Sequence, residues 1–146
     1  MIREWRENDI GQVTSILCEH EGSSSERKTV DLENVYEHFK EMENNELYAS
    51  FVYEIDTQIA GFISVVFYRS VLQKKGKALV NELAVRDDEE GAEIGRKLLD
   101  HVIKEAIRRE MDQIEVGVIK ENFQAIQFYK SSGISMEHFL LGREFG

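Results

Sequence analysis

The stretch that decides the fold is VNELAV (residues 80–85), DDEEGAEIG (87–95), RKLLDHVIKEAIRRE (96–110), QIEVGVI (113–119) and ENFQAIQFYKSSG (121–133). These patterns predict a strand, a glycine-bearing turn, a long amphipathic helix, a second strand and a short helix that ends at Gly133. A helix between two strands at this spacing predicts a right-handed crossover that makes the strands parallel neighbours. An anionic ligand would fit where the strands meet the N-terminus of the crossover helix.

Strand-like runs in the rest of the chain complete this sheet. They occupy residues 1–5, 47–55 and 58–70, and the strand of the deciding stretch begins at residue 77. Asp56 and Thr57 are expected to form a tight turn between two of these strands. Residues 58–70 are apolar on both faces, so we expect helices on both sides of the sheet. Residues 134–145 predict one last strand or two short ones.

Apolar stripes predict two helices near the start of the chain. Asn8 or Asp9 caps the first helix, Asp31 caps the second, and residues 21–29 form a polar, serine-rich loop between them. The single cysteine, Cys18, lies among apolar positions of the first helix. This placement predicts a buried thiol, and one cysteine leaves no internal disulfide.

The composition is typical of one globular domain, residues 1–146, in the cytoplasm. A chain of 146 residues with 42% hydrophobic residues supports a sizeable core. No apolar run approaches the roughly 18 residues of a membrane span, and the first residues do not resemble a signal peptide. The formal charge of −10 excludes nucleic acid as a general partner and leaves open a small cationic substrate, although acidic surfaces also serve solubility alone. The four histidines show no ligand spacing, so we expect no metal site.

Two motifs in the deciding stretch match a known family pattern. Asn122, Ala125, Tyr129 and Gly133 fit N-x-x-A-x-x-x-Y-x-x-x-G at every named position. A second pattern, Gln/Arg-x-x-Gly-x-Gly/Ala at the head of the long helix, is met in part by Glu90, Gly91, Ala92, Glu93, Ile94 and Gly95, followed by Arg96. With these motifs and its element order, the chain resembles the GNAT superfamily of acyl-CoA-dependent N-acyltransferases, in which the second pattern is the pyrophosphate loop.

The resemblance implies an α/β fold with a GNAT-like mixed, mostly antiparallel twisted sheet flanked by helices, in which residues 77–85 and 114–118 form a splayed parallel pair. It implies an N-acetyltransferase that uses acetyl-CoA as co-substrate and transfers the acetyl group to a primary amine by direct attack. In the family, pantetheine amides pair with the strand backbone, here at Leu83, Ala84 and Val85, and a backbone N–H near Leu83 could stabilise the oxyanion. The acceptor would be a small-molecule or peptide amine.

Three further residues acquire roles from the resemblance. Tyr129 matches the usual general acid, which protonates the departing thiolate; without the motif it would be a core tyrosine. Asn122 caps the short helix and, like Ala125, is also implied to contact the cofactor. Glu82 is the candidate general base, because burial in an apolar strand would favour proton acceptance. The alternative for Glu82 is an edge-facing or salt-bridged carboxylate. Asn81 is expected on the opposite face in a buried hydrogen bond.

The pyrophosphate loop departs from the family pattern in its charge. Glu90 replaces the basic or amide residue, Glu93 replaces the middle glycine, and residues 87–89 add three more carboxylates. A helix N-terminus attracts an exposed anion by roughly 0.3–1 kcal/mol, whereas one like charge at about 4 Å opposes it by about 1 kcal/mol in water. The features that still favour an anion are the first-turn N–H groups, Gly91, Gly95, Arg86, Arg96 and Lys97. The sequence therefore predicts weakened cofactor binding.

Two other functions remain open. A GNAT-fold binding or regulatory module with weakened CoA binding and little catalysis would account for the acidic loop, although the intact block at residues 122–133 argues against it. Another kind of α/β ligand-binding domain would leave both motif matches unexplained. A homodimer is also open, because the short segment after Gly133 could leave the last strand in need of a partner.

Overall fold

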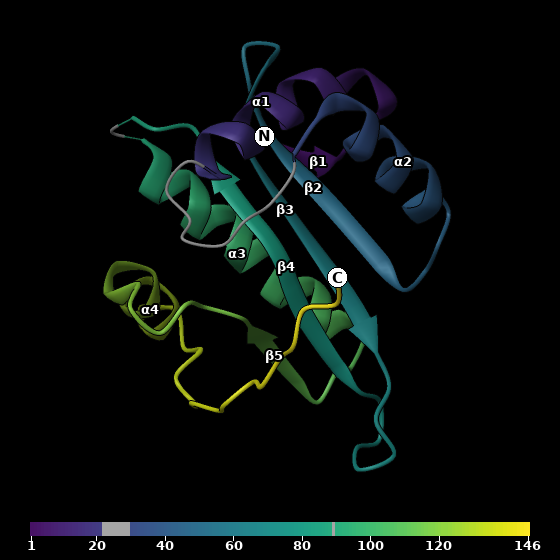
Figure 1. Cartoon of the computed structure of the whole chain (residues 1–146), viewed down its shortest axis with the longest axis vertical. Coiled ribbons are helices and arrows are strands. Elements are labelled where there is room, and N and C mark those ends of the chain that lie inside the picture. The colour runs from purple at the N-terminus through teal and green to yellow at the C-terminus, as the bar shows by residue number, and fades with distance from the viewer. Residues whose placement is uncertain (22–29, 89) are drawn as a thin grey trace.

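A five-stranded sheet in the order β1-β2-β3-β4-β5 forms the centre of the computed structural model (Figure 1). The structure describes residues 1–21, 30–88 and 90–146. Its elements are β1 (Ile2–Glu4), the short 3-10 helix η1 (Glu7–Asp9), α1 (Ile10–Glu21), α2 (Leu32–Met42), β2 (Tyr48–Ile55), β3 (Gln58–Tyr68), β4 (Lys77–Val85), α3 (Gly91–Arg108), β5 (Gln113–Val116) and α4 (Phe123–Ser131). Neighbouring strands are antiparallel except β4 and β5, which are parallel. The predicted α/β fold with a mixed, mostly antiparallel sheet is confirmed.

Helices cover both faces of the sheet, as the two-sided apolar pattern of β3 predicts. On one face α3 packs into a core cluster that includes Ile63 and Leu98. On the other face α1 and α2 pack over Phe62 and its neighbours, and Figure 1 shows α3 on the opposite side of the strands from these two helices. Gly61 allows α3 to approach β3 closely, because a Cβ there would lie 2.9 Å from side-chain atoms of both Ile94 and Leu98.

Local signals in the sequence set several element boundaries. The Asp31 carboxylate accepts a hydrogen bond from the Asn34 N–H at 2.7 Å and caps α2. Asp56 and Thr57 have φ angles of 48° and 67°, the left-handed values of a two-residue hairpin turn. Gly133 has a φ of 92° just after α4, where a residue with a side chain would be strained. These boundaries agree with the sequence predictions.

Strands β4 and β5 pair only where each begins. Residues 77–80 pair with residues 113–116, where β5 ends, so among the described residues the next five positions of β4 have only β3 as a strand neighbour. An extra residue in β4 accompanies this change. Ser64 pairs with Glu82 and Val65 with Val80, which leaves Asn81 as a β-bulge. The predicted parallel pair therefore opens along one edge of β4.

The sequence predictions for Cys18 and for residues 134–145 are wrong. Cys18 is exposed. Helix α1 buries Val13 and Ile16, and two residues turn a helix by more than half a circle, so position 18 faces away from the buried side. Residues 134–145 form no strand. Ile134 packs against the core, but the large apolar side chains from Met136 onward are exposed, with Leu140 at 90%. Nothing in the described part of the chain pairs with the outer edge of β5, so this segment lacks the hydrogen-bonded neighbour that would make it a strand. The polar loop expected over residues 21–29 lies, beyond residue 21, outside the described residues.

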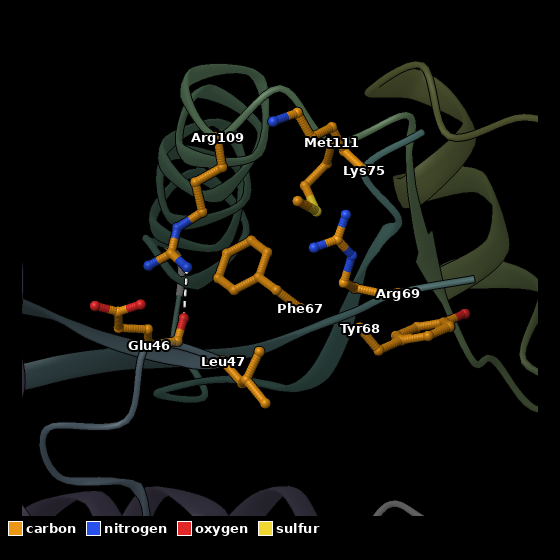
Figure 2. Close-up of a pocket in the computed structure, with 8 residues that line it drawn as sticks. All are labelled: Glu46, Leu47, Phe67, Tyr68, Arg69, Lys75, Arg109 and Met111. Atoms are coloured by element: carbon orange, nitrogen blue, oxygen red, sulfur yellow. Dashed lines mark hydrogen bonds between the residues drawn. The ribbon is translucent and has the colours of Figure 1, made fainter. Parts of the chain in front are cut away.

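Arg109 holds the C-terminal end of α3 to the sheet. Its guanidinium lies 3.9 Å from the centre of the Phe67 ring and donates to the Glu46 carbonyl at 2.6 Å, as Figure 2 shows. Its Nε donates to the Glu105 carboxylate at 3.0 Å. Arg108 binds the same carboxylate at 2.5 Å, and these hydrogen bonds, that of Arg108 first, lower the pKa of Glu105 to about 2.

Replacing Glu105 by glutamine should destabilise the protein at neutral pH and much less in acid. Because the folded-state pKa of about 2 lies below the reference value of 4.5, the stabilisation is present above pH 4.5 and is lost as the pH falls towards 2. We expect Glu105→Gln to unfold at a lower temperature than the parent at pH 7, with a gap that narrows below pH 4.5. Glu110→Gln, which removes an exposed carboxylate at the same helix end, is the control. A gap independent of pH would show that these ion pairs do not stabilise the fold.

Candidate active site

The unpaired edge of β4 is the first component of the candidate site. Leu83 and Val85 pack their side chains against the core on the α3 side, whereas Ala84 packs on the α1–α2 side. Alternate residues of an antiparallel strand direct their N–H and C=O groups to the neighbouring strand. The Arg86 N–H donates to Ala60 of β3. In this register Ala84 also faces β3, while Leu83 and Val85 offer their backbone groups to the open edge. An extended ligand with amide groups can take the place of a missing strand. The structure thus places the three predicted contacts together at the opening, and their role in binding stays a prediction.

The N-terminus of α3 follows at the end of this edge. Glu90 is the N-cap residue, and among the described residues no side chain caps the helix. The N–H groups of Gly91 and Ile94 donate to main-chain carbonyls, whereas that of Ala92 has no main-chain acceptor among the described residues. The side chain of Ile94 is buried in the core, so Ile94 presents only backbone to a ligand. An anion is the natural acceptor at this position.

Three acids of the loop, Asp88, Glu90 and Glu93, are paired with cations that were expected to attract the anion. Arg86 lies 2.7 Å from Glu90 and 2.5 Å from Asp88, and Lys97 lies 3.3 Å from Glu93. Exposed ion pairs of this kind contribute little to stability, so a ligand could replace the carboxylate in either of them. At these positions the loop therefore presents weak ion pairs rather than free charges. To bind Arg86 or Lys97, a phosphate must displace the carboxylate that already pairs with it.

The two glycines of the loop motif differ in their surroundings. A Cβ on Gly91 would lie 2.6 Å from the carbonyl oxygen of Arg86, so Gly91 lets α3 begin directly against the end of β4. A Cβ on Gly95 would meet its nearest atoms at 3.6 Å, in Phe128 and Val85, which is ordinary contact. Packing within the protein therefore explains why position 91 is a glycine, but it does not explain the glycine at position 95.

Helix α4 carries the Asn-to-Gly motif. The Asn122 side chain accepts a hydrogen bond from the Ala125 N–H at 3.1 Å and caps the helix as predicted. The Tyr129 ring lies 5.2 Å from that of Phe128 and packs against the core on the α3 side. Burial raises the pKa of Tyr129 to about 12, so its hydroxyl is protonated at neutral pH. Arg96 joins α3 to this helix through the hydroxyls of Ser131 at 2.7 Å and Ser132 at 3.3 Å.

Glu82 is exposed, which corrects the expectation of a buried base. The bulge brings it beside Ser64 on the α1–α2 face of the sheet, where its carboxylate accepts a hydrogen bond from the Ser64 hydroxyl. Asn81 is also exposed, as the extra residue of the bulge, so it is not the buried residue that the sequence predicted. Sequence reasoning missed Ser64. The available signal was a hydroxyl inside the apolar run of β3, since a buried hydroxyl needs a partner.

A separate cavity of about 330 Å³ lies at the opposite end of α3, over Phe67 and between Arg69, Lys75 and Arg109 (Figure 2). With 18 residues, α3 separates its two ends by about 27 Å. The cavity is therefore remote from the β4 edge and from the helix N-terminus, and we do not assign it to the candidate site.

Among the described residues, no helix is both long enough and apolar enough to cross a bilayer. Within the same ranges, the His, Cys, Asp and Glu side chains form no group of three or more that could hold a metal ion.

Comparisons with known proteins give relatives along nearly the whole chain. A model of the acetyltransferase (GNAT) family matches residues 12–134. A protein of Archaeoglobus fulgidus described as an uncharacterised N-acetyltransferase is 24% identical over 134 residues, which cover 91% of each chain. A transcriptional regulator from Bacillus halodurans has a TM-score of 0.85 at 22% identity, over 99% of both chains. A predicted acetyltransferase from Clostridium acetobutylicum, solved with acetyl-CoA, has a TM-score of 0.80 at 19% identity, over 99% of this chain and 95% of the other. The structural likenesses show that the fold is shared.

Alanine substitutions at the two loop glycines should have opposite effects on stability. Gly91→Ala forces a Cβ against a backbone oxygen, so we expect a loss of about 1–3 kcal/mol. Gly95→Ala meets no such obstacle and gains helix propensity of up to about 1 kcal/mol, so it should be neutral or stabilising. Urea unfolding of both variants measures the difference. Equal stabilities would mean that α3 can shift to admit a Cβ at position 91.

Proposed function

The chain belongs to the acetyltransferase (GNAT) family, and on that basis we propose that it transfers an acetyl group from acetyl-CoA to a primary amine by direct attack of the amine on the thioester. The observation that carries this proposal is the open edge of β4, which leads to the uncapped N-terminus of α3. Backbone groups on the edge suit the amides of pantetheine, and the helix N–H groups suit a pyrophosphate.

The proposed cofactor contacts follow from these two features. Leu83 and Val85 would pair their free backbone groups with the pantetheine amides, in place of a strand, and Ala84 would lie between them at the edge. The N–H group of Ala92 would donate to the pyrophosphate. Arg86 and Lys97 could then exchange their loop carboxylates for phosphate oxygens, so the cofactor would gain little net attraction from these cations. We therefore expect binding weaker than an unpaired basic loop would give.

Acetyl-CoA would supply an activated acyl group. Residues of this chain would transfer the protons and stabilise the negative charge that develops on the carbonyl oxygen. Glu82 takes the proton that the amine loses as the new N–C bond forms, directly or through a water molecule. A backbone N–H near Leu83 donates to the carbonyl oxygen as negative charge develops there. Tyr129 gives its proton to the sulfur as the C–S bond breaks. The products are then the acetamide and the free thiol.

The raised pKa of Tyr129 limits how much this residue can accelerate the reaction as a general acid. At about 12 it keeps the hydroxyl protonated through neutral and mildly alkaline pH, so the donor form is always present. The same shift makes proton transfer to a thiolate, with a reference thiol pKa of about 8.5, less favourable. We therefore expect an effect in the lower part of the range for general-acid catalysis.

A cationic acceptor is favoured over an anionic one. The net charge of −10 attracts amines, which are protonated at neutral pH before they react. Glu82 would meet the acceptor on the α1–α2 face, where the exposed face of α2 adds the carboxylates Glu37 and Glu41. Small-molecule amines and peptide amines both satisfy these conditions.

A binding or regulatory module with little catalysis is the second candidate function. The pairing within the loop favours it, because Arg86 and Lys97 are already engaged by loop acids and Arg96 by hydroxyls of α4. Tyr129 and the open edge favour the enzyme. The two candidates differ in whether acetyl-CoA binds and whether thiol is released.

Removing the Tyr129 hydroxyl should slow catalysis without weakening binding. We expect Tyr129→Phe to lower kcat roughly ten- to a thousandfold, nearer the lower figure, with little change in KM. Thiol release from acetyl-CoA would be followed with ethanolamine, spermidine and a lysine-containing peptide as acceptors. Tyr36→Phe, at an exposed position on α2, is the control. An unchanged kcat in Tyr129→Phe would make this residue a core tyrosine without a catalytic role.

Reversing the charge of the loop should strengthen cofactor binding. Glu90→Arg/Glu93→Gly frees Lys97 from Glu93, leaves Arg86 with Asp88 as its remaining partner, and makes the loop more positive. We expect at least tenfold tighter acetyl-CoA binding at low salt, and a smaller gain at physiological ionic strength, where the Debye length is about 8 Å. Isothermal calorimetry at both salt concentrations measures the change.

The control for the loop variant is Glu37→Arg/Glu41→Gln, which changes the net charge of the protein equally but on α2. If the loop variant binds no better than the parent, the two carboxylates do not oppose the cofactor. If neither protein binds acetyl-CoA at any salt concentration, the acetyltransferase proposal gives way to the binding module.

A further inference from the structure

The bulge in β4 decides which face of the sheet Glu82 occupies. Ala78 and Val80 point into the core on the α3 side, and strict alternation would send residue 82 to the same side. The extra residue, Asn81, shifts the register by one, so that Glu82 pairs with Ser64 instead. Leu83 then returns to the α3 side, which leaves Glu82 on the α1–α2 face.

Ser64 gives Glu82 a fixed partner on that face. Ser64 is 3% exposed, and its hydroxyl donates to Oε2 of Glu82. The neighbouring position across the sheet on β2 is Ser50, which is 5% exposed, so two buried serines and one glutamate form a row across three strands. A buried hydroxyl loses free energy if it has no acceptor. Ser64 therefore favours the Glu82 rotamer that brings the carboxylate back over β3.

We propose that Ser64 is a positioning residue that orients Glu82 on the α1–α2 face to accept the proton of the acceptor amine. The inference rests on the proposed function, in which Glu82 is the base. An exposed glutamate samples several rotamers, and fixing one of them places the base where the amine must arrive.

The proposal sets the direction of the reaction. Oε2 of Glu82 is bound by Ser64, which leaves Oε1 to receive the amine proton as the N–C bond forms. The amine would approach from the α1–α2 face, while the thioester would lie along the open edge of β4. The C–S bond breaks as the tetrahedral centre collapses, and the sulfur takes the proton of Tyr129. Ser64 itself exchanges no proton and touches no reactant.

The chain offers a matched control for this proposal. Ser64→Ala and Ser50→Ala each remove one buried hydroxyl from the same row, but only Ser64 reaches Glu82. We expect Ser64→Ala to lower kcat about tenfold at neutral pH and to leave the KM for acetyl-CoA unchanged. Ser50→Ala should leave kcat unchanged. Ser64→Thr keeps the hydroxyl and should restore kcat.

The hydrogen bond to Glu82 provides a readout that needs no acceptor. In protein with ¹³C-labelled glutamate carboxyls, the Glu82 signal is assigned by its absence in Glu82→Gln. At fixed pH its chemical shift should differ from that of the parent in Ser64→Ala but not in Ser50→Ala. Identical Glu82 shifts in Ser64→Ala and Ser50→Ala would overturn the proposal. Because the measurement uses folded protein without substrate, it holds whether or not any of the three test amines is acetylated.

The kinetic variants separate this proposal from the assignment of the base. Full activity in Glu82→Gln would remove Glu82 from the proposed mechanism and Ser64 with it. A strongly impaired Glu82→Gln together with an unimpaired Ser64→Ala would overturn only the role of Ser64. If Ser64 acts through Glu82, the double variant Ser64→Ala/Glu82→Gln should be no slower than Glu82→Gln alone. Additive losses would mean that Ser64 acts by another route.

Discussion

Main-chain hydrogen bonds join β4 to β5 over only four residue pairs, and every part of the candidate site depends on where that pairing stops. A parallel neighbour along the whole of β4 would satisfy those backbone groups of residues 81–85 that face away from β3, and would close the edge to a ligand. The bulge at Asn81 comes directly after the last pair, where such an insertion bends and twists a strand. Gly61 and Gly91 then let α3 lie close against β3 and β4, which places the helix N-terminus at the end of the open edge.

Charge in the loop is balanced locally rather than directed at a ligand. Arg86 and Lys97 already have carboxylate partners, so a phosphate that replaces Glu90 or Glu93 exchanges one exposed ion pair for another. Such an exchange has a small net free energy because each pair is weak in water. In the proposed function, the affinity for a pyrophosphate would then rest mainly on the helix N–H groups and on the backbone of the β4 edge. Both belong to the main chain, so an acidic loop is compatible with the proposed binding.

The sequence patterns predicted most accurately those features that depend on residues close together in the chain. Asp31 and Asn122 cap helices because each reaches an N–H three residues ahead. The opening between β4 and β5 was predicted from the family resemblance. The orientation of Glu82 was not predictable in the same way, because it depends on a one-residue shift against β3, a strand distant in the chain. Cys18 was misplaced for a related reason: apolar neighbours in sequence do not show which side of a helix faces the sheet.

The candidate acid and base belong to opposite faces of the sheet. Tyr129 packs with the core on the α3 side, whereas Glu82 lies on the α1–α2 side beside Ser64. A complete sheet would separate them by a layer of hydrogen-bonded backbone. A reacting carbonyl can be reached from both faces only beyond the edge of a strand, and β4 has such an edge where β5 no longer pairs with it. The same bulge that accompanies this edge turns Glu82 away from the α3 side. The proposed transfer requires a place for the thioester and a base on the side opposite the acid. The inserted residue, Asn81, lies where the edge opens and also turns Glu82 to that opposite side.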